Sequence, residues 1–249
     1  MTDNDNPRLN KYIASSGLCS RRKADELILN GSVKINGKTV TDFSVTVSAK
    51  DKVTVNGSLI TPQKEYTYIK YYKPAGYITT KSDEKNRKTI YDILPEEVQK
   101  LKPVGRLDKD STGLLIMTDD GDLINRMTHP SVKIPKVYRV CVEGKVTKNN
   151  ILTLADGIEI EKGKTAYADA EIIEFEDKNT VLNITLYQGM NRQIRKMAEF
   201  IGHPVISLKR IQHGTIDLSG LKRGAFKYLK PNQIKDLKKY LKNFEKETK

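Results

Sequence analysis

The stretch that decides the fold is "VGRLDKDSTGLLIMTDDGDL", residues 104–123. The apolar run Leu114 to Met117 predicts a buried strand, and Gly121 opens a turn into a helix-like segment. Gly105 permits unusual backbone angles just ahead of Asp108, so that carboxylate can project from the loop before the strand. The stretch also gathers carboxylates in a chain whose net charge is +13. Asp108 is therefore a candidate catalytic group.

An alternative interpretation of this stretch is a phosphatase loop, because "DKDST", residues 108–112, fits the D-x-D-x-T pattern of aspartate nucleophiles. That chemistry needs a buried parallel strand before the first aspartate, and Mg²⁺ bound by carboxylates. The preceding "KLKPVGR" contains Pro103, Gly105 and two lysines, so it cannot be a central strand. We regard this match as accidental. A lone loop aspartate is more often a turn residue, so the local pattern leaves the role of Asp108 open.

The charge balance indicates a partner class. The 249 residues include 44 Lys and Arg against 31 Asp and Glu, an excess that favours a polyanion such as nucleic acid, although solubility alone could account for it. With 30% charged and 37% hydrophobic residues, the chain has a globular composition and can bury one large core or two smaller ones.

Several function classes are not expected. The polar start of the chain predicts no signal peptide, and no apolar run approaches the roughly 20 residues that span a bilayer. Cys19 and Cys141 are isolated, as is typical of a reducing cytoplasm. The histidines form no cluster at metal-ligand spacing. We expect a cytoplasmic protein without a metal or a membrane contact.

Residues 8–60 predict a small domain of two helices and a hairpin. Leu9, Tyr12 and Ile13 share one helical face, and Ser20 is a suitable N-cap for a second helix. Asn36-Gly37 predicts a tight hairpin turn, and a further strand follows in residues 51–57. The polar residues 61–66 predict a linker.

Residues 67–232 predict a second, larger domain. Strand-like segments are interleaved with few helices, so we expect an α+β fold with a mixed, mainly antiparallel sheet flanked by helices. The helix expected in residues 191–202 places Ile194, Met197 and Ala198 on one side. Residues 233–249 predict a basic amphipathic helix or tail.

The amino-terminal domain has the features of an RNA-binding module. Arg21, Arg22 and Lys23 stand at a helix start, where backbone N–H groups already favour phosphate, although such a charge run is often only a solvated face. The order of helix, S-R-R-K-A helix start and hairpin resembles the alpha-L RNA-binding domain first described in a small-subunit ribosomal protein. The resemblance implies contacts to structured RNA from Arg8, Lys11, Ser20, Arg21, Arg22 and Lys23.

Four ordered motifs extend the resemblance to nearly the whole chain, about residues 8 to 232. They are "YYKPAGYITT", "GRLDKDSTGLLIMTDDGDL", "PKVYRV" and "QGMNRQIRKMAEFIGHPVISLKRIQHGTIDL". In this order they resemble pseudouridine synthases of the RsuA/RluB/RluF type, which act on ribosomal RNA and also carry an alpha-L domain.

The resemblance implies a nucleophile in Asp108, which acts without cofactor or metal. In this family the N1–C1′ bond of a uridine breaks, and the extruded base rotates and rejoins through C5. Attack at C1′, attack at C6 and formation of a glycal remain open. Arg195 is expected to keep Asp108 ionised, because burial alone would raise the pKa of a carboxyl. Tyr138 is expected to stack on the base and transfer a proton.

Supporting roles in substrate binding are expected of Arg106, Lys73, Asn191, Arg192 and Gln193. The expected function is pseudouridine formation in ribosomal RNA by a monomer, with a preference for the large-subunit 23S RNA. Two alternatives are a 16S-specific enzyme and a catalytically silent RNA-binding assembly factor.

Overall fold

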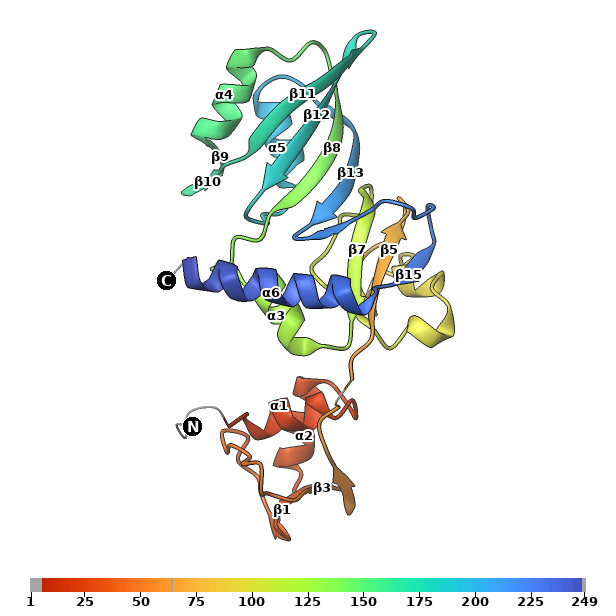
Figure 1. Ribbon diagram of the computed structural model, residues 1–249, viewed down its shortest axis with the longest axis vertical. Helices are drawn as coiled ribbons and strands as arrows, with labels where there is room; N and C mark the ends of the chain where they lie inside the picture. Colours follow the sequence, from red (N-terminus) through yellow and green to blue (C-terminus); the bar gives the residue numbers. More distant parts are fainter. Residues whose placement is uncertain (1–5, 64, 248–249) are drawn as a thin grey trace. The chain divides into compact units, whose positions relative to one another are not determined.

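The computed structural model describes residues 6–63 and 65–247. The chain divides into two compact units, Met1–Tyr66 and Thr67–Lys249, each with its own hydrophobic core (Figure 1). No helix in the described part of the chain is long and apolar enough to cross a membrane.

The first unit begins with the two expected helices, α1 (Leu9–Ser15) and α2 (Arg21–Leu29). The Ser20 hydroxyl accepts a hydrogen bond from the Lys23 amide at 3.2 Å, which confirms Ser20 as the N-cap of α2. The apolar faces of both helices are buried, at Leu9, Ile13, Ala24 and Ile28.

The helices of the first unit pack with four short strands, β1 (Val33–Ile35), β2 (Lys38–Thr39), β3 (Val53–Val55) and β4 (Ser58–Ile60). Their order in the sheet is β2-β1-β3-β4, and neighbouring strands are antiparallel. Asn36 and Gly37 both have positive φ, 51° and 80°, as a two-residue hairpin turn requires. The predicted hairpin is therefore confirmed, whereas the strand β4 was not predicted.

The second unit is built on a nine-stranded sheet with the path β11-β12-β8-β13-β7-β5-β15, while β14 pairs with β13 and β6 with β7. The strands are β5 (Tyr68–Lys73), β6 (Lys102–Pro103), β7 (Thr112–Thr118), β8 (Lys136–Glu143), β11 (Asp169–Glu176), β12 (Asn179–Leu186), β13 (Val205–His213), β14 (Ile216–Asp217) and β15 (Phe226–Tyr228). β13 and β7 run parallel, whereas the other pairings described for this sheet are antiparallel. The expected mixed, mainly antiparallel sheet is confirmed.

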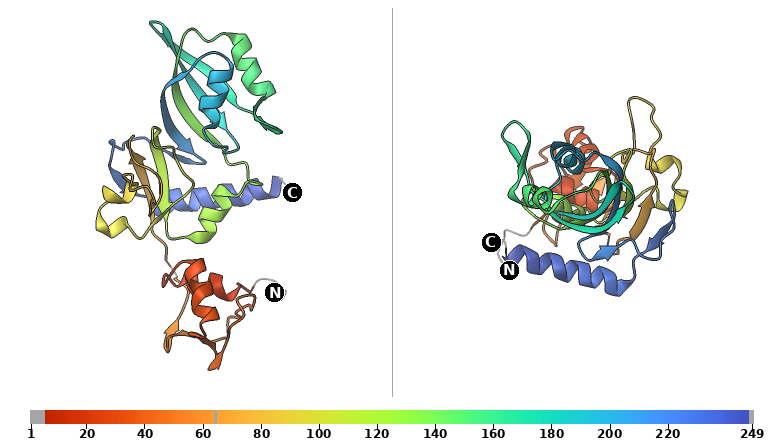
Figure 2. Two further views of the ribbon diagram at one scale, coloured as in Figure 1. Left: turned by 180° about the vertical axis from the view of Figure 1, so that it is seen from behind. Right: turned by 90° about the horizontal axis from the view of Figure 1, so that it is seen from above.

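Two hydrophobic cores cover different parts of this sheet, and Figure 2 shows the fold that holds them from two further sides. One core packs α4 (Lys148–Asp156) and α5 (Gln193–Phe200) against β8, β12 and β13, beside a small hairpin of β9 (Ile158–Glu161) and β10 (Lys164–Ala166). The other packs the 3-10 turns Ile90–Asp92 and Glu96–Val98 against β5 and β7. The two parts of the sheet meet where β13 pairs with β7.

The backbones of β7 and β13 approach each other very closely where the two strands pair. Gly113 of β7 is the register partner of Arg210 of β13, and a Cβ atom added to Gly113 would lie 2.2 Å from the Arg210 carbonyl oxygen. Gly113 also has φ +108°, where side chains are strained. Only glycine lets the two strands pair here without a shift of the backbone.

The chain ends in the helix α6 (Pro231–Glu247), which begins two residues before the predicted segment 233–249; residues 248 and 249 lie outside the described part. Leu237 and Leu241 are fully buried. Lys238 lies 3.5 Å from the Asp120 carboxylate, and Asp120 caps α3 (Gly121–Thr128). The helix is thus packed against the rest of the second unit.

Candidate active site

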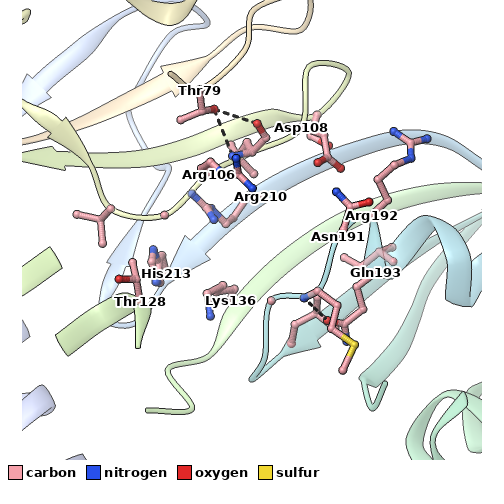
Figure 3. Close-up of a pocket in the computed structure, with 18 of the residues that line it drawn as sticks. Thr79, Arg106, Asp108, Thr128, Lys136, Asn191, Arg192, Gln193, Arg210 and His213 are labelled. Carbon is pink, nitrogen blue, oxygen red and sulfur yellow. Dashed lines mark hydrogen bonds between the residues drawn. The ribbon is translucent and has the colours of Figure 1, made fainter. Parts of the chain in front are cut away.

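A cavity of about 900 Å³ opens beside the β7–β13 junction (Figure 3). Five parts of the chain line it: residues within the segment 78–87, the loop 104–111 before β7, the segment 127–136 that leads into β8, the paired strands β8 and β13, and the segment 186–194 before α5. The size suits one nucleotide-sized ligand.

Asp108 lines this cavity and is half-buried. Its position is set by the neighbouring peptide, because the buried Thr79 hydroxyl donates to the Leu107 carbonyl at 2.9 Å and accepts from the Leu107 amide at 3.3 Å. The Ser111 amide donates to the Asp108 carbonyl at 3.1 Å and closes the turn. Among the described residues, the Asp108 carboxylate forms no hydrogen bond or ion pair. The carboxylate is therefore available for chemistry while its backbone is fixed.

Lys73 lies beneath this loop, outside the cavity lining. Its side chain is fully buried, and its Nζ atom lies within hydrogen-bond distance of four carbonyl oxygens. These belong to Asp108 at 3.0 Å, Ser111 at 2.9 Å, Pro74 at 3.1 Å and Lys109 at 3.3 Å. Burial lowers the pKa of Lys73 to about 8, and the carboxylates of Asp108 and Asp110 oppose that shift. The residue expected to bind substrate instead holds the backbone of Asp108.

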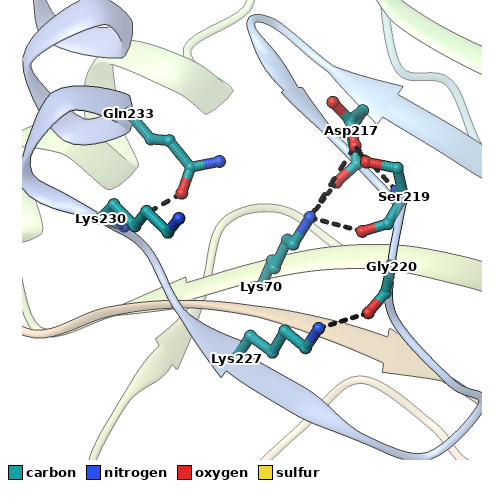
Figure 4. Close-up of polar contacts among 7 residues, drawn as sticks. All are labelled: Lys70, Asp217, Ser219, Gly220, Lys227, Lys230 and Gln233. Carbon is teal, nitrogen blue, oxygen red and sulfur yellow. Dashed lines mark hydrogen bonds and ion pairs between the residues drawn. The ribbon is translucent and has the colours of Figure 1, made fainter.

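A second buried lysine on β5, Lys70, holds a different loop (Figure 4). Its Nζ donates to the carbonyl oxygens of Ser219 at 2.8 Å and Asp217 at 3.2 Å, and lies 3.8 Å from the Asp217 carboxylate. Lys227 donates to the Gly220 carbonyl at 2.6 Å in the same loop. Lys70 thus holds the backbone of residues 217–219, as Lys73 holds the backbone of residues 108–111.

Tyr138 lines the cavity from β8 and is 8% exposed. Its register partner on β13 is Arg210, so the two residues occupy the same position along the paired strands. The aromatic ring forms part of the cavity wall while packing against the core. A planar ring in this position can support a flat, unsaturated ligand.

Asn191, Arg192 and Gln193 line the cavity next to α5. Figure 3 shows Asp108 on the same side as Asn191 and Arg192. Arg192 has φ 51°, and its guanidinium lies 3.9 Å from the carboxylate of Asp110; both side chains are exposed, so the pair contributes little stability. The Gln193 side chain is buried and accepts a hydrogen bond from the Met190 amide at 3.2 Å.

Two further expected site residues differ in their placement. Arg106 is exposed and lines the cavity. Arg195 is partly buried and does not line the cavity; in the described part of the chain it forms no ion pair with Asp108, and its Nε atom is buried without a hydrogen-bond partner. The Asp108 carboxylate does act electrostatically on Lys73, because it opposes the lowering of the Lys73 pKa by burial.

The cavity residues without a role in the sequence analysis include Lys136, Arg210 and His213. They come from β8 and β13, and Figure 3 shows Lys136 and His213 on the side of the cavity away from Asn191. The usable signal was Arg210 inside an otherwise strand-like segment, "VISLKRIQH", because a central strand rarely buries a guanidinium without a function.

The residues expected to bind RNA belong to the first unit. Arg8 and Arg22 are exposed, and Lys11 is half-buried on α1. Arg21 donates to the Asn10 side chain at 3.3 Å, and Lys23 forms an exposed ion pair with Glu26 at 2.7 Å. Ser20 caps α2. The helix start therefore presents exposed cations beside backbone N–H groups.

Within the described residues, no group of three or more His, Cys, Asp or Glu side chains is placed to share a metal ion.

The chain matches two family models. Residues 67–200 match the model for RNA pseudouridylate synthase, and residues 7–53 match the model for the S4 domain. The chain is 42% identical to the ribosomal large subunit pseudouridine synthase B of Bacillus subtilis, over 93% of this chain and 95% of that protein. It is 37% identical to the dual-specificity RNA pseudouridine synthase RluF of Escherichia coli, over 100% of this chain and 84% of that protein.

A solved structure also matches this chain over most of its length. A crystal structure of a pseudouridylate synthase aligns with a TM-score of 0.65 and 31% identity, covering 92% of this chain and 99% of that one. These matches confirm the resemblance that the four sequence motifs and the amino-terminal module indicated.

Proposed function

This chain belongs to the family of RNA pseudouridylate synthases, and we propose that it converts uridine to pseudouridine in ribosomal RNA with Asp108 as the nucleophile. The observation that carries the proposal is the position and surroundings of the Asp108 carboxylate. Its carboxylate lines a nucleotide-sized cavity without a hydrogen-bond or ion-pair partner among the described residues, while Thr79 and Lys73 hold the adjacent backbone. Such preorganisation is what a positioned nucleophile requires.

The reaction needs only an anion and proton transfers. The N1–C1′ bond breaks and a C5–C1′ bond forms, while C5 loses a proton and N1 gains one, so the atoms of the nucleotide balance. Asp108 supplies the anion, whether it attacks C1′, attacks C6 or assists formation of a glycal. The proposed reaction therefore uses no cofactor and no metal.

The other cavity residues receive roles by position. Tyr138 stacks on the extruded base, and its hydroxyl moves the proton. Arg106, Asn191 and Arg192 bind the nucleotide from the cavity wall, while the buried Gln193 supports the segment that carries them. Arg195 pairs with Asp108 in the complex with the nucleotide, since catalytic hydrogen bonds often tighten only in that complex.

Ribosomal RNA is the proposed substrate for three reasons. The relatives from B. subtilis and E. coli are named as a ribosomal large-subunit enzyme and a dual-specificity RNA enzyme. An S4 domain precedes the catalytic unit, and the net charge of +13 favours a polyanion. The large-subunit 23S RNA is the preferred target, and the small-subunit 16S RNA is the alternative.

The test uses Asp108→Asn with Asp110→Asn as the matched control, because both substitutions remove one loop carboxylate that lines the cavity. Each folded protein is incubated with 23S and 16S transcripts, with and without EDTA, and pseudouridines are mapped. The expected result is a 23S product from the wild type and from Asp110→Asn, none from Asp108→Asn, and no effect of EDTA. Equal product from Asp108→Asn would refute the nucleophile.

Other outcomes separate the alternatives. Product in the 16S transcript alone would assign the enzyme to the small subunit. RNA binding by the wild type without product in either transcript would favour a catalytically silent assembly factor.

A further inference from the structure

One wall of the cavity carries three nitrogen-bearing side chains that the proposed chemistry does not use. Lys136 on β8 is the register partner of His213 on β13, and the next cavity-lining residue of β8, Tyr138, is the partner of Arg210. We call Lys136, Arg210 and His213 the cationic patch. Because residues two apart on a strand share a face, the patch continues the surface that Tyr138 presents.

The patch contains buried nitrogen atoms that have no partner. Arg210 is 2% exposed and His213 is 1% exposed. The Arg210 Nε donates to the Leu114 carbonyl at 2.7 Å, but its Nη2 atom and both ring nitrogens of His213 lack any hydrogen-bond partner among the described residues. Buried polar groups nearly always have partners, so these atoms point to a ligand or to ordered water.

The charge of the patch is not balanced by an acid. Burial and the Arg210 guanidinium lower the pKa of Lys136 to about 8. Burial, Arg210 and Lys136 together hold the pKa of His213 well below its usual value, so its ring is neutral. No described carboxylate acts on the pKa of either residue. A buried guanidinium normally faces an acid, so an anion is the ligand whose charge suits this wall.

We propose that the cationic patch is a phosphate subsite, which holds a backbone phosphate of the RNA while the neighbouring base lies against Tyr138. This inference rests on the proposed function. Lys136 lies two residues from Tyr138 along β8, a rise of about 7 Å, so a phosphate at Lys136 remains within one nucleotide of the base. Lys136 is the partly exposed member of the patch, so it meets the phosphate first, and its Nζ already donates to the Ile134 carbonyl at 3.1 Å.

This subsite differs from the exposed cations at the cavity wall. Arg106 and Arg192 remain largely in water, where a phosphate contact is weakened by solvent and salt. The cationic patch lies in a desolvated wall, where the same charge acts more strongly. It therefore fixes the position of the nucleotide rather than merely attracting RNA.

The test observes His213 directly, with inorganic phosphate as the probe. Protein labelled with ¹⁵N at histidine gives ring signals for three residues, and the variants His129→Gln and His203→Gln identify those of His213 by elimination. Phosphate should shift the His213 signals in the wild type, and sodium chloride of equal ionic strength should not. The shift should vanish in Lys136→Met and persist in Lys133→Met, an exposed lysine outside the cavity lining.

The variant Lys136→Arg keeps a cation at this position and should retain the shift, which separates loss of charge from damage to the fold. An excess of 23S transcript should abolish the phosphate-induced shift, because RNA phosphate occupies the same place. The proposal is overturned if phosphate does not shift the His213 signals, which is expected if ordered water binds the buried nitrogen atoms. It is also overturned if phosphate shifts these signals in Lys136→Met as it does in the wild type.

The proposal is also overturned if inorganic phosphate still shifts the His213 signals in protein saturated with 23S RNA. The patch would then bind a free anion and not a phosphate of the RNA. None of these readouts measures isomerisation. A protein that forms no pseudouridine can therefore pass this test, and an active isomerase can fail it.

Discussion

The Lys73 ammonium nitrogen lies 3.0 Å from the carbonyl oxygen of Asp108, although the two residues are 35 positions apart in sequence. The contact joins the Lys-Pro-Ala-Gly stretch, which begins at the last residue of β5, to the loop that carries the proposed nucleophile. The Gly76 amide adds a second link by donating to the Lys109 carbonyl at 2.8 Å. The position of the Asp108 backbone is therefore set from beneath the cavity.

Replacing Lys73 with methionine should lower pseudouridine formation by about 100-fold, because a displacement of about 1 Å at a catalytic group costs that much. The carbonyl oxygens of the loop lose their donor, which also destabilises the fold by about 1–3 kcal/mol. RNA affinity should remain unchanged, because Lys73 does not line the cavity. Single-turnover rates and RNA binding curves measure the two quantities separately.

The matched control is Lys70→Met, since Lys70 is also a buried lysine of β5 that holds loop carbonyls. It should destabilise the protein comparably and leave the rate for the folded fraction nearly unchanged. If both variants lose the same activity per folded molecule, Lys73 has no specific role in positioning Asp108.

Gly113→Ala should destabilise the second unit by about 3 kcal/mol or more, because the new Cβ meets the Arg210 backbone and the residue keeps a positive φ. Gly121→Ala is the control, since a Cβ there meets nothing within 4 Å at the start of α3. Its effect should stay within about 1 kcal/mol. Urea denaturation of both variants gives the comparison, and equal stability would mean that the β7–β13 junction can relax.

Turn and cap residues made much of the fold predictable. Asn36-Gly37 and Ser20 placed the first hairpin and the start of α2, because both signals depend on local backbone geometry. The strand β4 was missed although Asn56-Gly57 repeats the hairpin signal with φ values of 50° and 83°. The helix α4 was also missed, since it buries only one of its residues, Leu154, fully and has a weak apolar face.

The cavity was less predictable than the fold. Asp108 and Tyr138 followed from the family motifs, but the burial of Lys73 depends on carbonyl groups that meet only in the folded chain. Arg210 stood out only as an arginine in a strand-like segment, and its pairing with Tyr138, like that of His213 with Lys136, appears only in the folded sheet. Long-range strand register is not encoded in any local pattern, so these residues could not be placed from the sequence.

The exposed cations at the start of α2 should contribute a salt-dependent part of RNA affinity. Reversing all three charges should weaken binding and reduce the slope of log affinity against log salt by roughly 0.7–0.9 for each RNA phosphate that is no longer neutralised. The residues are Arg21, Arg22 and Lys23. Filter binding at several salt concentrations measures the slope.

The control changes the net charge equally on the exposed face of α6, by the substitutions Lys235→Glu, Lys239→Glu and Lys242→Glu. A smaller effect is expected there. Equal slopes for both triple variants would show that net charge alone, not the S4 domain, determines RNA affinity.

The buried ammonium of Lys136 should make stability depend on pH. Its pKa is about 8 in the folded protein and about 10.4 in the unfolded chain. Between these values the unfolded state binds a proton that the folded state has released, so the free energy of unfolding rises with pH. Below about pH 8 both states hold the proton, and the cost of burying the charge is present in full.

Lys136→Met lacks this contribution, so the stability of the wild type relative to Lys136→Met should rise from pH 8 to about 10.4. Lys73, whose pKa is also about 8, is present in both proteins and cancels from the difference. The control is Lys133→Met, which replaces an exposed lysine, and its stability difference from the wild type should not show this rise with pH. With inorganic phosphate present, the relative stability of the wild type should begin to rise at a higher pH, because a bound anion holds the proton on Lys136. If phosphate leaves the pH of this rise unchanged, binding at the cationic patch is contradicted.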